Sequence, residues 1–184
     1  MAGRCFGDGD PLYSAYHDQE WGRPLHDERA LLELLCLEGF QAGLSWLTIL
    51  RRRESMRRAF AGFDPAALAD FGPAEITRLL ADPGVIRHRG KIEAAIANAR
   101  ATLALRAAGT PLPGFVWSFR PEPGPAPASF AEVPPKTAAS AALSAALIRH
   151  GFRFVGPTTA YAFMQAAGLV NDHLADCPTH LSPP

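Results

Sequence analysis

Apolar residues recur along much of the chain at the three- and four-residue spacing that places them on one face of a helix. The clearest stripe contains Leu31, Leu34 and Leu35, and its continuation falls on Glu38. Asp27 is a good N-cap for this helix, which we expect to run toward the glycines at positions 39 and 43. The register therefore places the carboxylate of Glu38 on the side that faces the core.

Capping residues and chain breaks predict further helices. Proline at a first helical position, after a capping-type residue, predicts short helices at Pro65 and Pro73. A long alanine-rich helix is expected to end at Gly109. The other predicted helices start at Ser45, cover residues 139–151, and run from about Thr158 to Ala167. We find no alternating run, strand pair or internal repeat, so the predicted fold class is all-α.

Two segments lack a helical pattern. Residues 1–24 are short on periodicity, and we interpret them as an ordered arm. Residues 110–137 contain eight prolines, too many for a regular helix or a central strand, and this predicts a surface excursion. Its aromatic sequence FVWSF, at positions 115–119, is expected to be pinned to the core because three large apolar rings are unfavourable in water.

The composition narrows the class of protein. With 184 residues, 48% of them hydrophobic, the chain is long enough for one core or two small interwoven lobes, and we expect a single compact unit. Eighteen basic residues balance eighteen acidic ones, so net charge gives no general attraction to nucleic acid or acidic membranes. No apolar run reaches the roughly 20 residues of a membrane helix, and the N-terminus lacks a signal-peptide pattern. We therefore expect a cytoplasmic protein without a membrane partner, and we also expect a monomer, although the sequence itself does not reveal the oligomeric state.

The carboxylate of Glu38 needs an explanation, because burying an unpaired carboxylate costs several kcal/mol. The group must be neutralised, paired with a cation such as Arg89, or directed into a cavity. It lies in the sequence CLEGFQAGLSW, in which two glycines follow it before Trp46. The pattern of the helix alone leaves these three explanations open.

Cysteine and histidine residues near both ends of the chain have the composition of a metal site. Cys5 and His17 are separated by eleven residues, and His173 and Cys177 by three, a spacing that would place the last two on one face of a helical turn. Two thiolates and two imidazoles suit tetrahedral Zn²⁺, and four protein ligands would make the metal structural. The alternative is that Cys5 is an ordinary terminal thiol and His17 an ordinary surface imidazole.

The sequence FRFVGPTTAYAFM resembles the helix-hairpin-helix element of DNA-repair glycosylases, in which a turn directs backbone N–H groups at a DNA phosphate. Gly156 matches one of the two usual glycines, and Phe154 occupies the position of the other. Thr158 stands where bifunctional members carry a lysine nucleophile, so lyase chemistry is not expected. Asn171, in LVNDH, stands where many members have a catalytic aspartate.

Two clusters of basic residues stand out against the neutral total. The first, at positions 51–58, is by default a solvated helix face. The second contains Arg87, His88, Arg89 and Lys91 and lies where a helix is expected to begin, a place where positive charge is unfavourable for the helix dipole. A bound anion would offset that repulsion, so we expect Arg89 and Lys91 to contact DNA.

Several long segments together resemble the 3-methyladenine DNA glycosylase I family. The likeness extends from Arg4 to Cys177 and is weakest in the proline-rich part. It implies an all-helical helix-hairpin-helix fold with a structural zinc ion on Cys5, His17, His173 and Cys177. The segments that carry it are RCF, DPLYSAYHDQEWG, CLEGFQAGLSW, RHRGKIEAAIANA, FVWSF and FRFVGPTTAYAFMQAAGLVNDH.

The resemblance also implies a base pocket and an activity. Glu38 would accept hydrogen bonds from a flipped base, and aromatic rings would stack on it. N3-methylation makes adenine cationic, so an anionic Glu38 would pair with the damaged base and not with normal adenine. The expected activity is hydrolytic release of free 3-methyladenine from alkylated double-stranded DNA. The implied pocket residues are Glu38, Tyr16, Trp46, Tyr13 and Phe6, with Leu44 as a wedge into the DNA.

Plainer explanations remain open at this stage. Trp46 and Tyr16 would serve equally as core aromatics, and Leu44 as a core residue. A catalytically silent helix-hairpin-helix module with a zinc site would bind DNA without releasing a base. In a zinc hydrolase, water would instead replace one of the four metal ligands.

Overall fold

The computed structural model describes residues 3–181, and within them it contains helices and no β-strand, which confirms the all-α prediction. Short 3₁₀ turns occur at Ala61–Phe63, Phe130–Glu132 and Pro178–Leu181. The α-helices are α1 (Pro11–Gln19), α2 (Glu28–Gln41), α3 (Trp46–Ala59), α4 (Pro65–Ala69), α5 (Pro73–Ala81), α6 (Arg89–Ala107), α7 (Leu112–Trp117), α8 (Ala138–Arg149) and α9 (Pro157–Ala166).

The helix starts follow the capping chemistry of the sequence. The side chain of Asp27 accepts a hydrogen bond from the Ala30 N–H at 2.8 Å and thereby begins α2. The Ser45 hydroxyl accepts from the Thr48 N–H at 3.2 Å and begins α3 in the same way. Pro65 and Pro73 occupy the first positions of α4 and α5, where the missing N–H costs nothing. These starts confirm the predicted helices.

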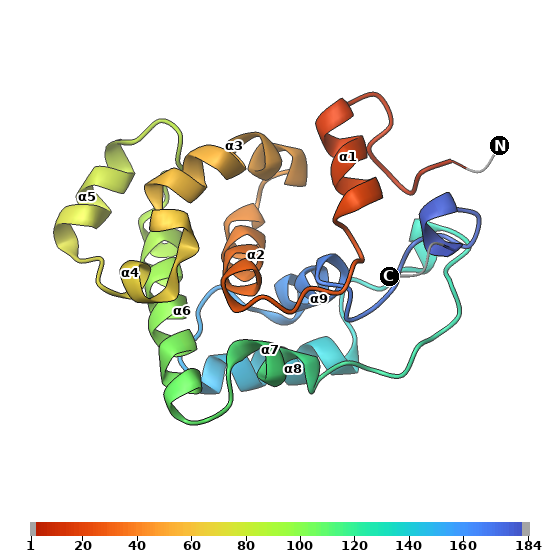
Figure 1. Cartoon of the computed structure of the whole chain (residues 1–184). Helices are drawn as coiled ribbons and strands as arrows, with labels where there is room; N and C mark the ends of the chain where they lie inside the picture. The colour runs from red at the N-terminus through yellow and green to blue at the C-terminus, as the bar shows by residue number, and fades with distance from the viewer. Residues whose placement is uncertain (1–2, 182–184) are drawn as a thin grey trace.

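Helix α2 runs through the middle of the molecule (Figure 1) and contacts α3, α6, α7 and α9. Its residues Leu31, Leu35 and Phe40 are almost fully buried, and they belong to one continuous hydrophobic cluster that takes in residues from α1 to α9. Because α2 is surrounded on several sides, Leu31, Leu35 and Glu38 are all buried, whereas Leu34 is partly buried and packs against the cluster. Within residues 3–181, no helix combines the length and apolarity needed to span a membrane.

Three local predictions are wrong. Residues 1–24 are not simply an arm, because they contain α1, which begins with the Asp10 N-cap and Pro11. The proline-rich segment contains α7, whose N-terminus accommodates the nearby prolines because the first turn needs no intrahelical N–H donors. Residues 173–177 form an irregular loop with a turn and not a helical turn. The aromatic sequence within 115–119 is nevertheless packed on the core, as expected.

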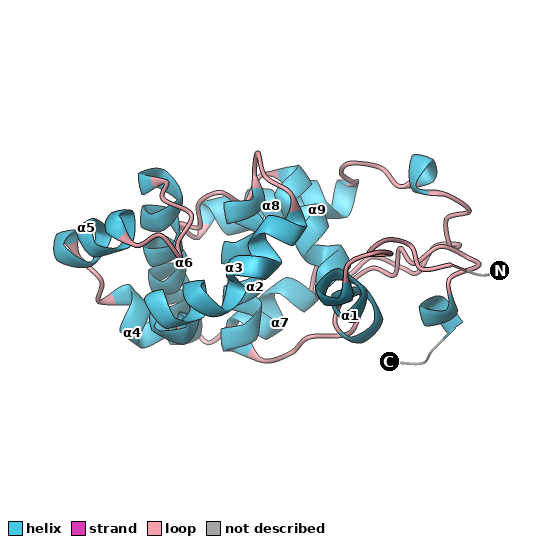
Figure 2. Ribbon diagram, turned by 90° about the horizontal axis from the view of Figure 1, so that it is seen from above, coloured by secondary structure: helices cyan, strands magenta, loops and turns pink. Residues whose placement is uncertain are grey.

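The segment before α1 and the loop after α9 lie at the same end of the molecule, near α1, whereas α4, α5 and α6 lie toward the opposite end (Figures 1 and 2). The backbone N–H of Ala175 donates to the Pro127 carbonyl at 2.9 Å, which ties the proline-rich segment to the C-terminal loop. This arrangement brings the N-terminal and C-terminal cysteine and histidine residues together. It also places α1 beside the central helices that carry Glu38 and Trp46.

Candidate functional site

Glu38 projects from α2 into the core, where its side chain is 5% exposed. Within the described residues, its Oε2 atom has no hydrogen-bond partner. Burial raises the pKa of this carboxyl to about 8, because the charged form loses its hydration without a compensating cation. Arg89 lies instead beside Glu93, with 3.7 Å between the charged atoms, so it does not neutralise Glu38.

Aromatic rings from two other helices surround this part of α2. Tyr16 of α1 and Trp46 of α3 have ring centroids 5.4 Å apart, and both are buried. The Nε1 atom of Trp46 is also buried without a partner in residues 3–181. Burial, followed by the charge of Glu38, raises the pKa of Tyr16 well above its ordinary value and also raises that of Tyr13. The tyrosines and the carboxyl therefore share one low-dielectric environment.

Phe6 extends this aromatic group toward the proline-rich segment. Its ring centroid lies 4.9 Å from that of Tyr13 and 6.4 Å from that of Tyr16. On its other side, Phe130 lies 6.4 Å away, although 43% of Phe130 is exposed. Sequence reasoning missed Phe130 because it treated residues 110–137 as an excursion away from the core. Its only sequence signal was a lone aromatic residue among small and polar ones.

A cleft of about 260 Å³ lies against the outer side of this aromatic group. Tyr16 and Trp46 form part of its wall, and the paired side chains of Glu20 and Arg53, joined at 2.6 Å, form another part. Glu38 does not line this cleft. The carboxyl is therefore nearly enclosed by protein in this structure.

Most of the residues expected to contact DNA are at least partly exposed, and one of them is buried. Leu44 is 41% exposed and follows Gly43, whose positive φ of 82° makes the sharp turn between α2 and α3. Gly156 is the N-cap of α9, and Thr158 is exposed in its first turn. Arg89 is exposed at the start of α6. These positions are accessible to a large partner.

Lys91 is the exception, and the structure gives it a different role. The residue is 8% exposed, and its Nζ donates to the carbonyls of Phe40 and Ala42 at 2.9 and 2.5 Å. These carbonyls lie at the C-terminal end of α2, where backbone acceptors lack helical partners and positive charge is favourable. Lys91 therefore caps the helix that carries Glu38, and its ammonium is not directed toward a DNA surface.

The first basic cluster was expected to be a solvated helix face, but several of its side chains form ion pairs within the protein. Arg51 pairs with Asp10 at 2.8 Å, and Arg53 pairs with Glu20. Arg57 contacts both Glu33 and Glu54. Side chains held in this way fasten α3 to neighbouring elements and contribute little net positive charge to the surface.

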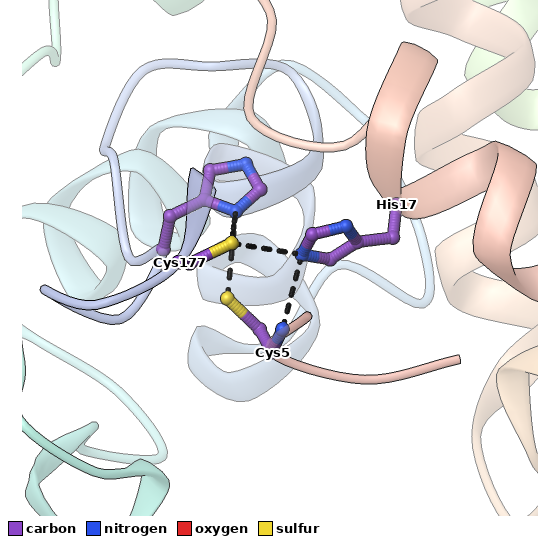
Figure 3. A group of neighbouring side chains, drawn as sticks. Cys5, His17 and Cys177 are labelled. Atoms are coloured by element: carbon purple, nitrogen blue, oxygen red, sulfur yellow. Dashed lines mark hydrogen bonds between the residues drawn. The ribbon is translucent and has the colours of Figure 1, made fainter. Parts of the chain in front are cut away.

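The four terminal cysteine and histidine side chains converge on one point. Their ligand atoms all lie within 4.8 Å of one another, and three of the four residues are buried. The Nδ1 atom of His173 is 3.5 Å from the Cys5 Sγ and 3.7 Å from the Cys177 Sγ, and the His17 Nε2 is 3.6 Å from the Cys177 Sγ. Figure 3 shows the side chains of Cys5, His17 and Cys177 pointing toward one another from the two ends of the chain.

The three nitrogen–sulfur distances of 3.5, 3.6 and 3.7 Å fit a tetrahedral metal ion. Zinc bonds of about 2.0–2.3 Å would hold neighbouring nitrogen and sulfur atoms about 3.3–3.8 Å apart. The other ring nitrogens are also engaged: the His17 Nδ1 lies 2.8 Å from Asp18, and the His173 Nε2 lies 3.1 Å from the Trp21 carbonyl. Such partners orient imidazole ligands and set which nitrogen is available to a metal.

Asn171 lies beside this cluster. Its Oδ1 accepts a hydrogen bond from the His173 backbone N–H at 3.2 Å. The adjacent Asp172 accepts from the Tyr161 hydroxyl and from the Gln165 amide. The residues in the LVNDH sequence therefore shape the loop that carries His173.

Known proteins with similar sequences share this arrangement of helices. A family model described as methyladenine glycosylase matches residues 6–180. The chain belongs to the methyladenine glycosylase family. This membership confirms the resemblance found in the sequence, which rested on segments distributed over the same length of chain.

Individual members of the methyladenine glycosylase family are similar over nearly the whole chain. DNA-3-methyladenine glycosylase 1 of Escherichia coli is 53% identical over 171 residues, which make up 91% of each protein. A crystal structure of a 3-methyladenine DNA glycosylase I superposes with a TM-score of 0.94 at 50% identity, over 98% of this chain and 100% of the other. A variant of 3-methyladenine DNA glycosylase I in complex with 3-methyladenine gives 0.92 at 37% identity, over 100% of both chains.

Proposed function

We propose that this protein is a DNA glycosylase that flips 3-methyladenine out of alkylated double-stranded DNA and releases it by hydrolysis. One observation supports the proposal most strongly: a buried carboxyl oxygen without a partner lies among aromatic rings in a member of the methyladenine glycosylase family. An extruded base is bound by stacking and by hydrogen bonds to its polar edge, and this group of side chains offers both.

The unpaired state of Glu38 supports selectivity for a cationic base. With a pKa of about 8, the carboxyl is mostly protonated at neutral pH in the free protein. A purine that carries positive charge would favour the carboxylate form and would donate its amino hydrogen to it. Normal adenine is neutral and offers no such charge, so it would leave the buried group poorly compensated.

The methylated base is a good leaving group, which reduces the demands on the protein. When the bond between the sugar carbon and the base nitrogen breaks, its electron pair remains on the base and neutralises the positive charge. Water then adds to the sugar carbon and loses a proton. Thr158 occupies the place of the lysine nucleophile in bifunctional relatives, so water, and not a protein amine, takes this role.

DNA would be held by the α8–α9 pair, which we interpret as a helix-hairpin-helix element. The first turn of α9, at Gly156 and Thr158, offers backbone N–H groups to a phosphate. Leu44 would occupy the space left by the flipped nucleotide, and Arg89 would contact the backbone. All four residues lie at or near the surface, as this role requires.

For the cysteine and histidine cluster we propose a structural zinc ion held by Cys5, His17, His173 and Cys177. The donor set and the spacing of its atoms support this assignment. When bound, the ion supplies a permanent crosslink between the N-terminal segment and the C-terminal loop. With four protein ligands it has no open position for a substrate.

The decisive test is release of free 3-methyladenine from methylated duplex DNA, measured by mass spectrometry. The proposal predicts release by the wild-type protein and a strong decrease in Glu38→Gln. DNA binding without release would indicate a silent binding module. Activity that persists in Glu38→Gln and stops when zinc is removed from a still-folded protein would indicate a zinc hydrolase.

A further inference from the structure

Asn98, in the middle of α6, is a buried amide that holds the turn between α8 and α9. Its side chain is 2% exposed. The Oδ1 atom accepts from the Arg153 backbone N–H at 2.7 Å, and the Nδ2 atom donates to the Arg153 carbonyl at 3.2 Å. One side chain therefore engages both backbone groups of a single turn residue, which fixes the orientation of the two peptide units on either side of Arg153.

The next residue of the turn has an unfavourable backbone conformation. Phe154 has a φ of 55°, which is costly for a residue other than glycine. The paired hydrogen bonds from Asn98 act on the residue directly before it, so they help to hold the chain in this conformation. Without them, the turn would be free to relax toward a more common geometry, and the direction in which α9 begins would change with it.

The same turn is pressed against α2 beside Glu38. A Cβ atom built on Gly39 would lie 3.2 Å from both the Cβ and the carbonyl oxygen of Phe154. A side chain at position 39 would therefore require the turn to shift by a few tenths of an ångström. Gly39 directly follows Glu38, so the position of the turn is coupled to the position of the carboxyl through α2.

We propose that Asn98 is a positioning residue that fixes the α8–α9 turn relative to Glu38, so that the start of α9 contacts the DNA backbone while a base occupies the aromatic site. This inference rests on the proposed function, in which the first turn of α9 holds a phosphate. Because hydrogen bonds to an anion weaken steeply with misalignment, a small rotation of the turn would reduce DNA affinity without altering the base site itself.

Two substitutions of Asn98 test its two hydrogen bonds to Arg153. Asn98→Asp keeps the shape and an acceptor for the Arg153 N–H but places a second oxygen against the Arg153 carbonyl. Asn98→Leu removes both hydrogen bonds. Thr102→Val is the matched control, because Thr102 is fully buried one turn further along α6 and its hydroxyl donates to the Asn98 backbone carbonyl at 2.8 Å.

The experiment measures three quantities for each variant: excision from methylated duplex DNA, affinity for an undamaged duplex, and affinity for free 3-methyladenine. For both Asn98 variants we expect the KM for methylated DNA to rise about tenfold and the affinity for undamaged DNA to fall about tenfold. We expect kcat at saturating DNA and the affinity for free base to stay within about twofold. Thr102→Val should leave all three quantities unchanged.

Amide hydrogen exchange supplies a readout that a general loss of stability would not reproduce. The Arg153 amide and those of the first turn of α9 should exchange faster in the Asn98 variants, while amides in the middle of α2 stay protected as in Thr102→Val. Unchanged DNA affinity in Asn98→Leu would overturn the proposal. A parallel loss of DNA and free-base affinity, together with loss of protection in α2, would also overturn it by showing a fold defect.

Failure of this inference and failure of the proposed function give different results. If the wild-type protein releases no 3-methyladenine, the proposed function fails regardless of Asn98. If the wild-type protein releases the base and the Asn98 variants retain wild-type KM and DNA affinity, only the positioning role fails.

Discussion

Two groups of buried polar side chains in this protein differ in whether their polar atoms have partners within the protein. Around Glu38 and Trp46, two polar atoms are buried without a partner among residues 3–181. In the cysteine and histidine cluster, the ligand atoms lie within 4.8 Å of one another, and both imidazoles have a further partner on the other ring nitrogen. Burying either group of polar atoms costs free energy, but only in the cysteine and histidine cluster do other protein atoms offset that cost.

The difference teaches what each group is for. An oriented set of donors at metal-ligand distances suits a partner that is always present, and such a partner stabilises the fold. A carboxyl left without a partner destabilises the free protein and gains its compensation only when a ligand arrives. In the proposed function, the cluster therefore serves stability and Glu38 serves recognition of the base, so variants of the two should affect different measurements.

The largest effect is expected from loss of the proposed metal site. Cys177→Ser, or removal of zinc with a chelator, should lower the melting temperature by about 10 °C, because a crosslink worth several kcal/mol is lost. Zinc content, measured by elemental analysis, should fall from one ion per chain to near zero in the variant. Excision should remain measurable at temperatures below the lowered melting point.

Cys36→Ser is the control for this experiment. Cys36 is also a buried cysteine, but it lies in α2, outside the cluster. Its substitution should reduce stability modestly and leave the zinc content unchanged. If Cys177→Ser kept both its zinc and its melting temperature, the proposed metal site would be wrong.

Glu38→Gln should have the next largest effect, and on activity instead of stability. The amide keeps the shape of the side chain but has no negative charge for a cationic base, so the excision rate should fall about a hundredfold, equivalent to ~2.7 kcal/mol. Glu28→Gln removes a carboxylate from the same helix, where it pairs with Arg106, and should leave the excision rate within about twofold. Equal excision by wild type and Glu38→Gln would show that the carboxyl does not recognise the base.

The pH dependence of stability should separate Glu38 from the other carboxylates. Its pKa in the folded protein is about 8, against 4.5 for an ordinary glutamate, so between these values the folded state holds a proton that the unfolded state has released. This contribution to stability therefore falls as pH rises through the interval and is lost above the folded pKa. The slope should approach ~1.4 kcal/mol per pH unit, because one proton is exchanged.

Urea unfolding of wild type and Glu38→Gln across this interval measures the effect. The variant lacks the titrating group, so its stability relative to wild type should increase steadily as pH rises. Parallel curves would mean that the carboxyl ionises normally and is not isolated from water.

The smallest effects are expected from substitutions of Lys91 and Arg89. Lys91→Met removes the two hydrogen bonds to the α2 carbonyls and should lower stability by ~1–2 kcal/mol, with DNA affinity within about twofold of wild type. Arg89→Met should instead weaken binding to duplex DNA several-fold with little change in melting temperature. The reverse result for the pair would restore the DNA role expected for Lys91 from the sequence.

Much of the fold could be predicted because its signals are local. Asp27, Ser45 and Asp64 cap helices through bonds to residues three positions away, so sequence spacing contains the information. The same type of signal, Asp10 before Pro11, was present for α1, but the weak apolar periodicity of that helix hid it. For α7, the surrounding prolines suggested irregular chain although they are tolerated in a first helical turn.

The residues that make up the candidate site could be predicted from the sequence, but the contacts that they form could not. The sequence placed Glu38 on the core face, and the family resemblance supplied its aromatic neighbours. Nothing local indicates that Lys91 would bond to carbonyls some fifty residues away, or that Asn98 would bond to Arg153. Such contacts depend on how helices pack, and a pattern along one helix does not contain that information.

A crystal structure of the protein bound to 3-methyladenine would test the central claim most directly. The account predicts that the amino group of the base lies within hydrogen-bonding distance of the Glu38 Oε2 atom, with its ring stacked against the aromatic side chains of Tyr16 or Trp46. A base seated elsewhere, for example in the outer cleft beside Glu20 and Arg53, with Glu38 still unpaired, would contradict it.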